Sequence, residues 1–199
     1  MTGNNPNGDF TKMLKALEGS DFIIRYVPFG KSKHAEHYKL TDCFCWFWLH
    51  FKESKEIKET DYWQHHQKES EINSWRGIAF EEVCLQHVYQ IKSVLQIAGV
   101  ASTESSLLVR GTKETDGMQI DLIIDRADDV VNVCEMKYSK SPFVVSKPYA
   151  EKLSKRLSDM ESAMPEKTIQ MTLVSIKGME RNENSEIFAT SIVADDLFR

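Results

Sequence analysis

Residues 117–139, GMQIDLIIDRADDVVNVCEMKYS, place three charged side chains within two apolar, β-branched runs. Asp121 belongs to the first run, and Glu135 and Lys137 belong to the second. Charged side chains are rarely buried in a sheet unless they are paired or hold a metal ion. This stretch therefore decides the fold and marks the first place to look for a functional site.

The two runs predict neighbouring antiparallel strands, because only the short turn RADD at residues 126–129 separates them. Alternate side chains of a strand point to the same face, so Glu135 and Lys137 share one face. Asp121 reaches that face beside Glu135 only if the two residues pair directly. This register requires a turn with an odd number of residues, or a bulge, since an even turn sets Asp121 opposite Cys134. We predict the odd turn or the bulge.

Two explanations of this charge cluster are open. Two carboxylates close together in a partly dry site repel each other, and a hard cation such as Mg²⁺ or Mn²⁺ would neutralise both. Beside such a metal, Lys137 would orient the nucleophile or offset charge that develops on a phosphoryl oxygen. In the other explanation, Lys137 forms a structural ion pair with Glu135 or Asp121 at the end of the sheet. Spacing alone does not separate the two.

A further carboxylate lies on a helix predicted over residues 75–97, which Gly99 is expected to end. Glu81 borders the apolar stripe of this helix and is the better candidate to lean toward the sheet, whereas Glu82 should be more exposed. A solvated helix charge is the alternative for Glu81. The stripe at helical spacing consists of Phe80, Cys84, Val88, Ile91 and Leu95.

The remaining patterns predict an α/β domain over residues 74–199, with a mixed sheet and helices packed on its faces. A helix is expected over residues 146–164, with Pro148 in its first turn. Its apolar residues are Tyr149, Leu153, Leu157, Met160 and Met164. Further strands are expected at residues 106–110, 168–176 and 186–194.

Residues 1–51 predict a partial winged-helix segment. Such a unit needs further helices upstream, so we expect the chain to be the C-terminal part of a longer protein. The expected elements are a helix at 10–18 with Asp9 as N-cap, strands at 22–29 and 37–40 joined by a basic turn at 30–36, and an aromatic helix at 43–51 capped by Thr41 or Asp42.

Residues 52–73 are polar and charged, which predicts a linker between the two parts. The linker contains the pair His65 and His66. Adjacent residues do not share a helix face, so we interpret both as solvated side chains and not as metal ligands.

Composition predicts a globular cytoplasmic protein. Hydrophobic residues make up 41% of the 199 residues, and the net charge is −5. No apolar run approaches the roughly 20 residues that span a bilayer, and the N-terminus lacks the pattern of a secretion signal. The four cysteines form no CxxC pair and are expected to be core thiols in a reducing compartment. The acidic balance disfavours a large non-specific DNA-binding surface.

The stretches GIAFE, QIDLIID and CEMK, with the following helix KPYAEKL, together resemble the PD-(D/E)XK (restriction-endonuclease-like) nuclease superfamily. More narrowly, FIIRYVPFGK and YKLTDCFCWFWLHF resemble the end of the winged helix in bacterial and archaeal AAA-type ATPases that carry such a nuclease-like C-terminal domain. The resemblance implies a restriction-endonuclease-like mixed central sheet flanked by helices. It also implies divalent-metal-dependent hydrolysis of phosphodiester bonds in DNA.

The resemblance assigns roles to individual residues. Lys137 would be the catalytic lysine, and Gln119 would be a polar support. The implied ligands of Mg²⁺ or Mn²⁺ are Asp121, Glu135, Glu81 and the backbone carbonyl of Met136. The basic residues expected to border the site and hold DNA phosphates, or else to form a solvated helix face, are Lys140, Lys147, Lys152, Lys155 and Arg156.

The chain contains no GxxxxGK[ST] motif, so an ATPase partner would be a separate subunit or an N-terminal module outside this sequence. The alternative function is a non-catalytic DNA-binding or regulatory module of an AAA-type ATPase system. In that case the cleft would be blocked, or Lys137 would be held in an ion pair. A winged-helix DNA binder with the second domain as its scaffold is a further alternative.

Overall fold

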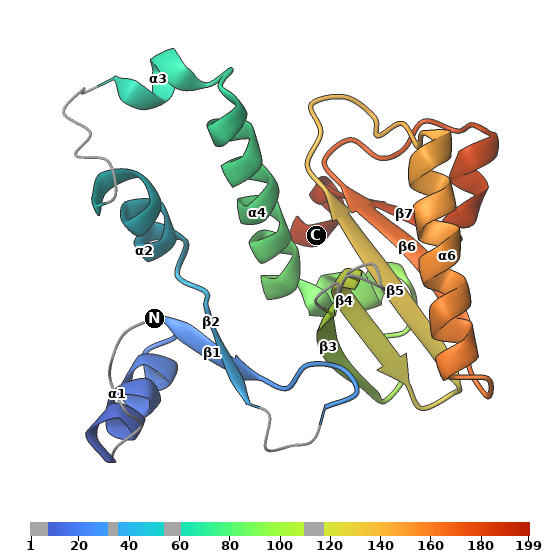
Figure 1. Cartoon of the computed structure of the whole chain (residues 1–199), viewed down its shortest axis with the longest axis horizontal. Coiled ribbons are helices and arrows are strands. Elements are labelled where there is room, and N and C mark those ends of the chain that lie inside the picture. Colours follow the sequence, from blue (N-terminus) through green and yellow to red (C-terminus); the bar gives the residue numbers. More distant parts are fainter. Residues whose placement is uncertain (1–7, 32–35, 54–60, 110–117) are drawn as a thin grey trace, which may run out of the picture. The chain divides into compact units, whose positions relative to one another are not determined.

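The computed structural model describes residues 8–31, 36–53, 61–109 and 118–199 (Figure 1). The chain divides into two compact units, Met1–Ile72 and Asn73–Arg199. The first unit holds a two-stranded sheet, and the second holds a five-stranded sheet. In the described ranges, no helix combines the length and the apolar character needed to cross a lipid bilayer.

The first unit contains a hairpin between helices. Its strands are antiparallel, with Ile23 opposite Leu40. The winged-helix assignment stays a prediction, and residues 32–35 of the predicted basic turn lie outside the described residues. The elements in chain order are helix α1 (Gly8–Gly19), strands β1 (Ile23–Tyr26) and β2 (His37–Leu40), helix α2 (Cys43–Phe47), the π-helix η1 (Trp48–Glu53) and helix α3 (Tyr62–His66).

The ends of these helices differ in part from the prediction. Helix α1 begins at Gly8, so Asp9 lies in its first turn and not at the N-cap, where its charge still favours the helix dipole. Asp42 caps α2, and its Oδ1 accepts the Cys45 N–H at 2.5 Å. The expected single helix over residues 43–51 widens into η1 after Phe47.

The predicted linker, residues 52–73, is largely helical where the structure describes it. Helix α3 lies within it, and helix α4 (Ser70–Gln86) begins there. Nδ1 of His66 lies 2.5 Å from Oε1 of Glu69. Among the described residues, no three or more His, Cys, Asp or Glu side chains lie close enough together to bind a metal ion, and this includes His65 and His66.

The second unit is built on one mixed sheet, with strand order β3-β4-β5-β6-β7. Neighbours among β3, β4 and β5 are antiparallel, whereas β5, β6 and β7 are parallel. Helix α6 (Lys147–Ala163) connects the parallel pair β5 and β6, as a parallel connection requires. The strands are β3 (Ser102–Val109), β4 (Met118–Arg126), β5 (Val130–Lys137), β6 (Thr168–Ser175) and β7 (Thr190–Val193).

The helix predicted over residues 75–97 is two helices, α4 and α5 (Val88–Val94). The break has a local cause at His87. Its ring Nδ1 donates to the Val83 carbonyl at 2.7 Å, the acceptor that its own backbone N–H would use in a continuous helix. The backbone N–H of His87 instead bonds to the Cys84 carbonyl at 3.0 Å.

Other boundaries also differ from the prediction, and strand β3 begins at Ser102 instead of residue 106. Gln96, with φ of +59°, takes the left-handed position after α5 that was assigned to Gly99, and the Ile97 N–H then reaches the Lys92 carbonyl. The last strand is shorter than residues 186–194, because Asn182 caps a 3-10 helix, η2 (Glu183–Ile187), ahead of β7. A second 3-10 helix, η3 (Ala194–Phe198), ends the chain.

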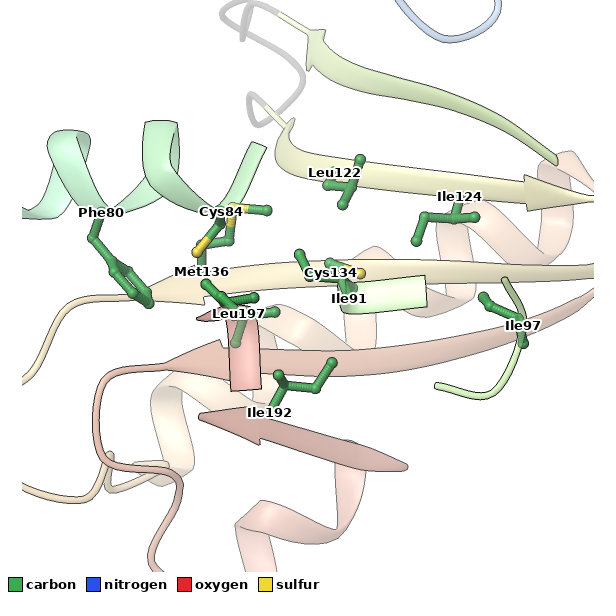
Figure 2. Close-up of a cluster of buried hydrophobic side chains, with 11 residues drawn as sticks. Phe80, Cys84, Ile91, Ile97, Leu122, Ile124, Cys134, Met136, Ile192 and Leu197 are labelled. Atoms are coloured by element: carbon green, nitrogen blue, oxygen red, sulfur yellow. The ribbon is translucent and has the colours of Figure 1, made fainter. Parts of the chain in front are cut away.

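One face of the sheet packs on α4, α5 and η3 through an apolar cluster (Figure 2). Cys84 and Cys134 are core thiols in this cluster, as predicted. The prediction is wrong for Cys43, which is exposed, and Cys45 is half-buried; both belong to the short helix α2 of the first unit, and none of the residues of that helix is buried. The cluster consists of Phe80, Cys84, Ile91, Ile97, Leu122, Ile124, Cys134, Met136, Val174, Ile192 and Leu197.

Candidate functional site

The turn between β4 and β5 sets the register of the charged residues. Strand β4 ends at Arg126 and β5 begins at Val130, which leaves a turn of three residues, 127–129. Asp129 has φ of +61°, the left-handed conformation that closes a three-residue hairpin loop. The prediction of an odd turn is therefore confirmed.

The strand pairing agrees with this turn. Leu122 pairs with Cys134, so the register carried one step further sets Asp121 opposite Glu135. The side chains of Asp121, Glu135 and Lys137 thus belong to the face of the sheet opposite the apolar cluster of Figure 2. Two strands that are adjacent in sequence bring the three charged groups together.

Glu135 is the centre of a hydrogen-bond network on this face. Only 5% of its surface is exposed. Its Oε1 accepts bonds from Lys137 Nζ at 2.6 Å and from the Tyr149 hydroxyl at 2.7 Å. Its Oε2 accepts a bond from Arg156 Nη1 at 2.5 Å. Burial alone would raise the pKa of Glu135, but Lys137, Tyr149 and Arg156 together hold this pKa below its ordinary value.

Asp121 is bound differently. Its Oδ2 accepts the backbone N–H of Met136 at 3.0 Å, and Gln119 Nε2 lies 3.5 Å from its Oδ1. Burial, and next the negative charge of Glu135, raise the pKa of Asp121 above its ordinary value. The two carboxylates therefore have pKa values shifted in opposite directions, which is typical of paired acidic groups at functional sites.

Helix α6 supplies two of the three partners of Glu135. It begins after Ser146, with Pro148 in its first turn, so Tyr149 lies close to its N-terminal end. The Tyr149 ring centroid is 5.6 Å from Lys137 Nζ. Burial, and next the charge of Glu135, raise the pKa of the Tyr149 hydroxyl, so it stays a hydrogen-bond donor. Arg156 lies two turns further along the same helix.

The loop that joins β5 to α6 is anchored to the loop after β6. The Phe143 N–H donates to the Gly178 carbonyl at 2.8 Å, and the Glu180 N–H donates back to the Phe143 carbonyl at 2.9 Å. The buried residue Val145 accepts a bond from Asn182 Nδ2 at 3.2 Å. These bonds fix the start of α6 relative to the sheet and so position Tyr149.

Glu81 is not brought into a three-carboxylate group with Asp121 and Glu135. Among the residues that the structure describes, no three or more His, Cys, Asp or Glu side chains are placed to share a metal ion. The charge of Glu81, one turn before Cys84 in α4, helps to raise the pKa of the buried Cys84 thiol after the larger effects of burial, Cys134 and Asp121.

The expected exposure of the two helix glutamates is reversed. Glu82 is 3% exposed, whereas Glu81 is partly exposed. Apolar periodicity identifies only the side of α4 that packs on the sheet, and it does not indicate that Glu82 is buried. A metal-ligand role for Glu81 and for the Met136 carbonyl stays a prediction.

The prediction that Arg156 holds phosphates is contradicted, because Arg156 is 8% exposed and bonded to Glu135. Arg156 lies at helical spacing from Tyr149, Leu153 and Met160, so it occupies the buried stripe of α6. An arginine among the apolar residues of a helix is a sequence signal that it pairs with a buried carboxylate, and this signal could have identified the network. The basic residues of the prediction that are exposed are Lys140, Lys147, Lys152 and Lys155.

The donor set on this face fits a hard divalent cation. Two carboxylates, Asp121 and Glu135, approach each other from neighbouring strands, and carboxylate oxygen is the donor that Mg²⁺ and Mn²⁺ prefer. The ammonium of Lys137 already occupies a cation position at Oε1 of Glu135. Mg²⁺ commonly binds one or two carboxylates and takes its other ligands from water and substrate phosphates.

No family profile matches the chain, and no curated protein sequence matches it. A solved structure described as the crystal structure of protein of unknown function AF1548 is similar over 55% of this chain and 56% of that chain. The sequence identity is 15% and the TM-score is 0.38. At this level of similarity the comparison carries no argument about fold or function.

Proposed function

We propose that the second unit hydrolyses phosphodiester bonds in DNA with a divalent metal ion, at a site built on Asp121, Glu135 and Lys137. The observation that carries the proposal is the β4–β5 register, which sets two carboxylates with oppositely shifted pKa values beside a lysine. The proposal includes a restriction-endonuclease-like fold of the PD-(D/E)XK class for this unit. The order of a helix glutamate, a strand aspartate and Glu-x-Lys supports that class.

Asp121 and Glu135 would hold the metal ion, with Glu81 and the Met136 carbonyl as further expected ligands. Bound there, the ion would acidify a water molecule and neutralise charge on the phosphate. Asp121 is oriented for this role by the backbone N–H of Met136.

The other groups of the network act on Glu135 and on the substrate. Lys137 carries the positive charge that would offset negative charge developing on a phosphoryl oxygen. The Tyr149 hydroxyl and Arg156 fix the Glu135 carboxylate by hydrogen bonds to its two oxygens. Gln119 lies beside Asp121 and would support its orientation.

DNA is the proposed substrate because exposed lysines lie on the loop and helix that follow Glu135 and Lys137. Lys140, Lys147, Lys152 and Lys155 are exposed along residues 139–156, where they would contact phosphates. We further propose that the first unit is part of a winged helix and that an AAA-type ATPase, as a separate subunit or an N-terminal module, is the partner.

The test is cleavage of supercoiled and single-stranded DNA with Mg²⁺ or Mn²⁺, and with EDTA as the metal-free condition. Asp121→Asn should lower the rate by about a hundredfold or more, because it removes a metal-binding charge while keeping the acceptor for the Met136 N–H. Asp159→Asn, a change at an exposed aspartate of α6, is the matched control and should cut like the unaltered chain. Cutting that survives Asp121→Asn would contradict the proposal.

A non-catalytic DNA-binding or regulatory module is the second candidate. One observation favours it: Lys137, Tyr149 and Arg156 together already satisfy both oxygens of Glu135. In this case the cluster serves as a structural ion-pair network, and the unit docks on DNA or on an ATPase. This candidate predicts no binding of Mn²⁺ at Asp121 and no metal-dependent cutting.

A further inference from the structure

Glu135 has two cationic partners that differ sharply in exposure. The Arg156 side chain is 8% exposed and bonds to Oε2, whereas the Lys137 side chain is 31% exposed and bonds to Oε1. We call Oε2 the inner oxygen and Oε1 the outer oxygen. The second partner of the outer oxygen, the Tyr149 hydroxyl, carries no charge.

The two cations are therefore not equally easy to remove. Separating Arg156 from the inner oxygen would leave a charge on each side buried and uncompensated, which is costly. Lys137 has a long flexible stem and an ammonium that hydrates strongly, so solvent can take up its charge when it leaves the outer oxygen. The outer oxygen would still accept the Tyr149 hydrogen bond.

The net charge of the site also indicates that Lys137, and not Arg156, is the cation that leaves Glu135. Asp121 and Glu135 contribute two negative charges, and Lys137 and Arg156 contribute two positive charges. A divalent ion added to this balanced group would leave it strongly positive. The release of one ammonium to solvent reduces that excess, and Lys137 is the partner that reaches solvent.

We propose that Lys137 is an exchangeable counter-ion of Glu135. Its ammonium holds the outer oxygen until a divalent cation takes that oxygen, and it then turns outward, where it can meet a phosphate, while Arg156 keeps the inner oxygen. This inference rests on the proposed function and gives the two cations different roles: Lys137 leaves Glu135 when the metal binds, and Arg156 stays. It also makes Arg156 a positioning residue that acts through Glu135.

The first test is the Mn²⁺ affinity of the full chain, measured from the electron paramagnetic resonance signal of free Mn²⁺. Lys137→Met removes the competing ammonium and should bind Mn²⁺ about tenfold more tightly or better, the equivalent of one charge-assisted hydrogen bond. Lys177→Met, at an exposed lysine just beyond β6 that takes no part in the hydrogen bonds of Glu135, should change the affinity less than about twofold.

The outcomes separate the inference from the proposed function. If the unaltered chain binds Mn²⁺ and Lys137→Met binds it no more tightly, the exchange is wrong and the metal-dependent function stands. If neither chain binds Mn²⁺, both are wrong. Binding by Lys137→Met alone would overturn the exchange, because Lys137 would then exclude the metal from the unaltered chain and would not give way to it.

A second measurement follows Lys137 directly. Acetic anhydride modifies amines that are free of ion pairs more quickly, and mass spectrometry reads each lysine separately. Adding Mn²⁺ should raise the labelling rate of Lys137 several-fold relative to Lys177, and Asp121→Asn should abolish the rise. A Lys137 labelling rate that does not respond to Mn²⁺ in a chain that binds it would overturn the proposal.

Discussion

Strand β5 presents two faces built from alternate residues of the same short run. Cys134 and Met136 lie on one face within an entirely apolar cluster, whereas Glu135 and Lys137 lie on the other within a network of hydrogen bonds. The difference comes from the covering helices, because α4 and α5 bring apolar side chains and α6 brings Tyr149 and Arg156. A sheet can bury a carboxylate when the helix above it supplies the partners.

The largest effect is expected where the charged face would lose its buried cation. Arg156→Met leaves the inner oxygen of Glu135 buried without its partner and should lower the free energy of unfolding by about 3–5 kcal/mol. Arg181→Met, at an exposed arginine, should change it by less than about 0.5 kcal/mol. Urea denaturation measures both. Equal stability of the two variants would mean that the charged face does not depend on Arg156.

The matching change on the apolar face is Leu122→Ala. Leu122 is buried in the cluster of Figure 2, and its truncation should cost about 3 kcal/mol of unfolding free energy through lost contacts and a cavity. Because it lies on the other face from Asp121, the folded variant should keep the Mn²⁺ affinity of the unaltered chain. A folded Leu122→Ala protein that no longer binds Mn²⁺ would show that the two faces are not independent.

The two carboxylates of the charged face should respond to pH with opposite signs. The pKa of Glu135 is lowered from 4.5 on folding, so its stabilisation is present above that value and is lost as the pH falls through the folded pKa. The pKa of Asp121 is raised from 3.8, so its ionised form costs stability at neutral pH, and this cost disappears as the pH falls through its folded pKa.

Asp121→Asn tests this sign in the metal-free protein. The variant should be more stable than the unaltered chain at neutral pH, by about 1 kcal/mol, because it removes a buried charge that destabilises the folded state. The gain should shrink toward zero as the pH falls below 3.8, where the carboxyl is mostly protonated in both the folded and the unfolded chain. Urea denaturation over that pH range measures it, and a gain that grows in acid would show that the sign is wrong.

The smallest effect concerns the turn of residues 127–129, which joins β4 to β5. Asp129 adopts φ of +61°, so Asp129→Gly should relieve backbone strain and stabilise the unit by roughly 0.5 kcal/mol. Ala127→Gly in the same turn should instead lower stability by roughly 0.5 kcal/mol, since it only adds freedom to the unfolded chain. Changes of the same sign in both variants, measured by thermal unfolding, would contradict the account of this turn.

The sequence predicts the β4–β5 hairpin well because two independent constraints agree there. Alternation fixes which residues share a face, and the parity of the turn fixes whether Asp121 lies opposite Glu135 or Cys134. Both are local, so residues 118–137 are sufficient to place Asp121, Glu135 and Lys137. The mixed sheet with helices on its faces follows from the same patterns.

The partners of Glu135 and the helix boundaries are not local in this way. Arg156 lies 21 residues from Glu135, and although periodicity places Arg156 on the apolar stripe of α6, it does not identify the carboxylate that pairs with it. The break between α4 and α5 depends on the ring of His87 competing for a backbone carbonyl, which helix propensity does not register. The burial of Glu82 is likewise not indicated by the apolar stripe of its helix.

The most direct test of the central claim is a crystal structure of the chain grown with Mn²⁺, with the ion located by its anomalous scattering. We predict one anomalous peak within coordination distance of Asp121 and of the outer oxygen of Glu135, with Arg156 still on the inner oxygen and the Lys137 ammonium turned away. The contradicting result would come from crystals grown at a saturating Mn²⁺ concentration. In them, no peak would lie at these two carboxylates, and Lys137 would still be bonded to Glu135.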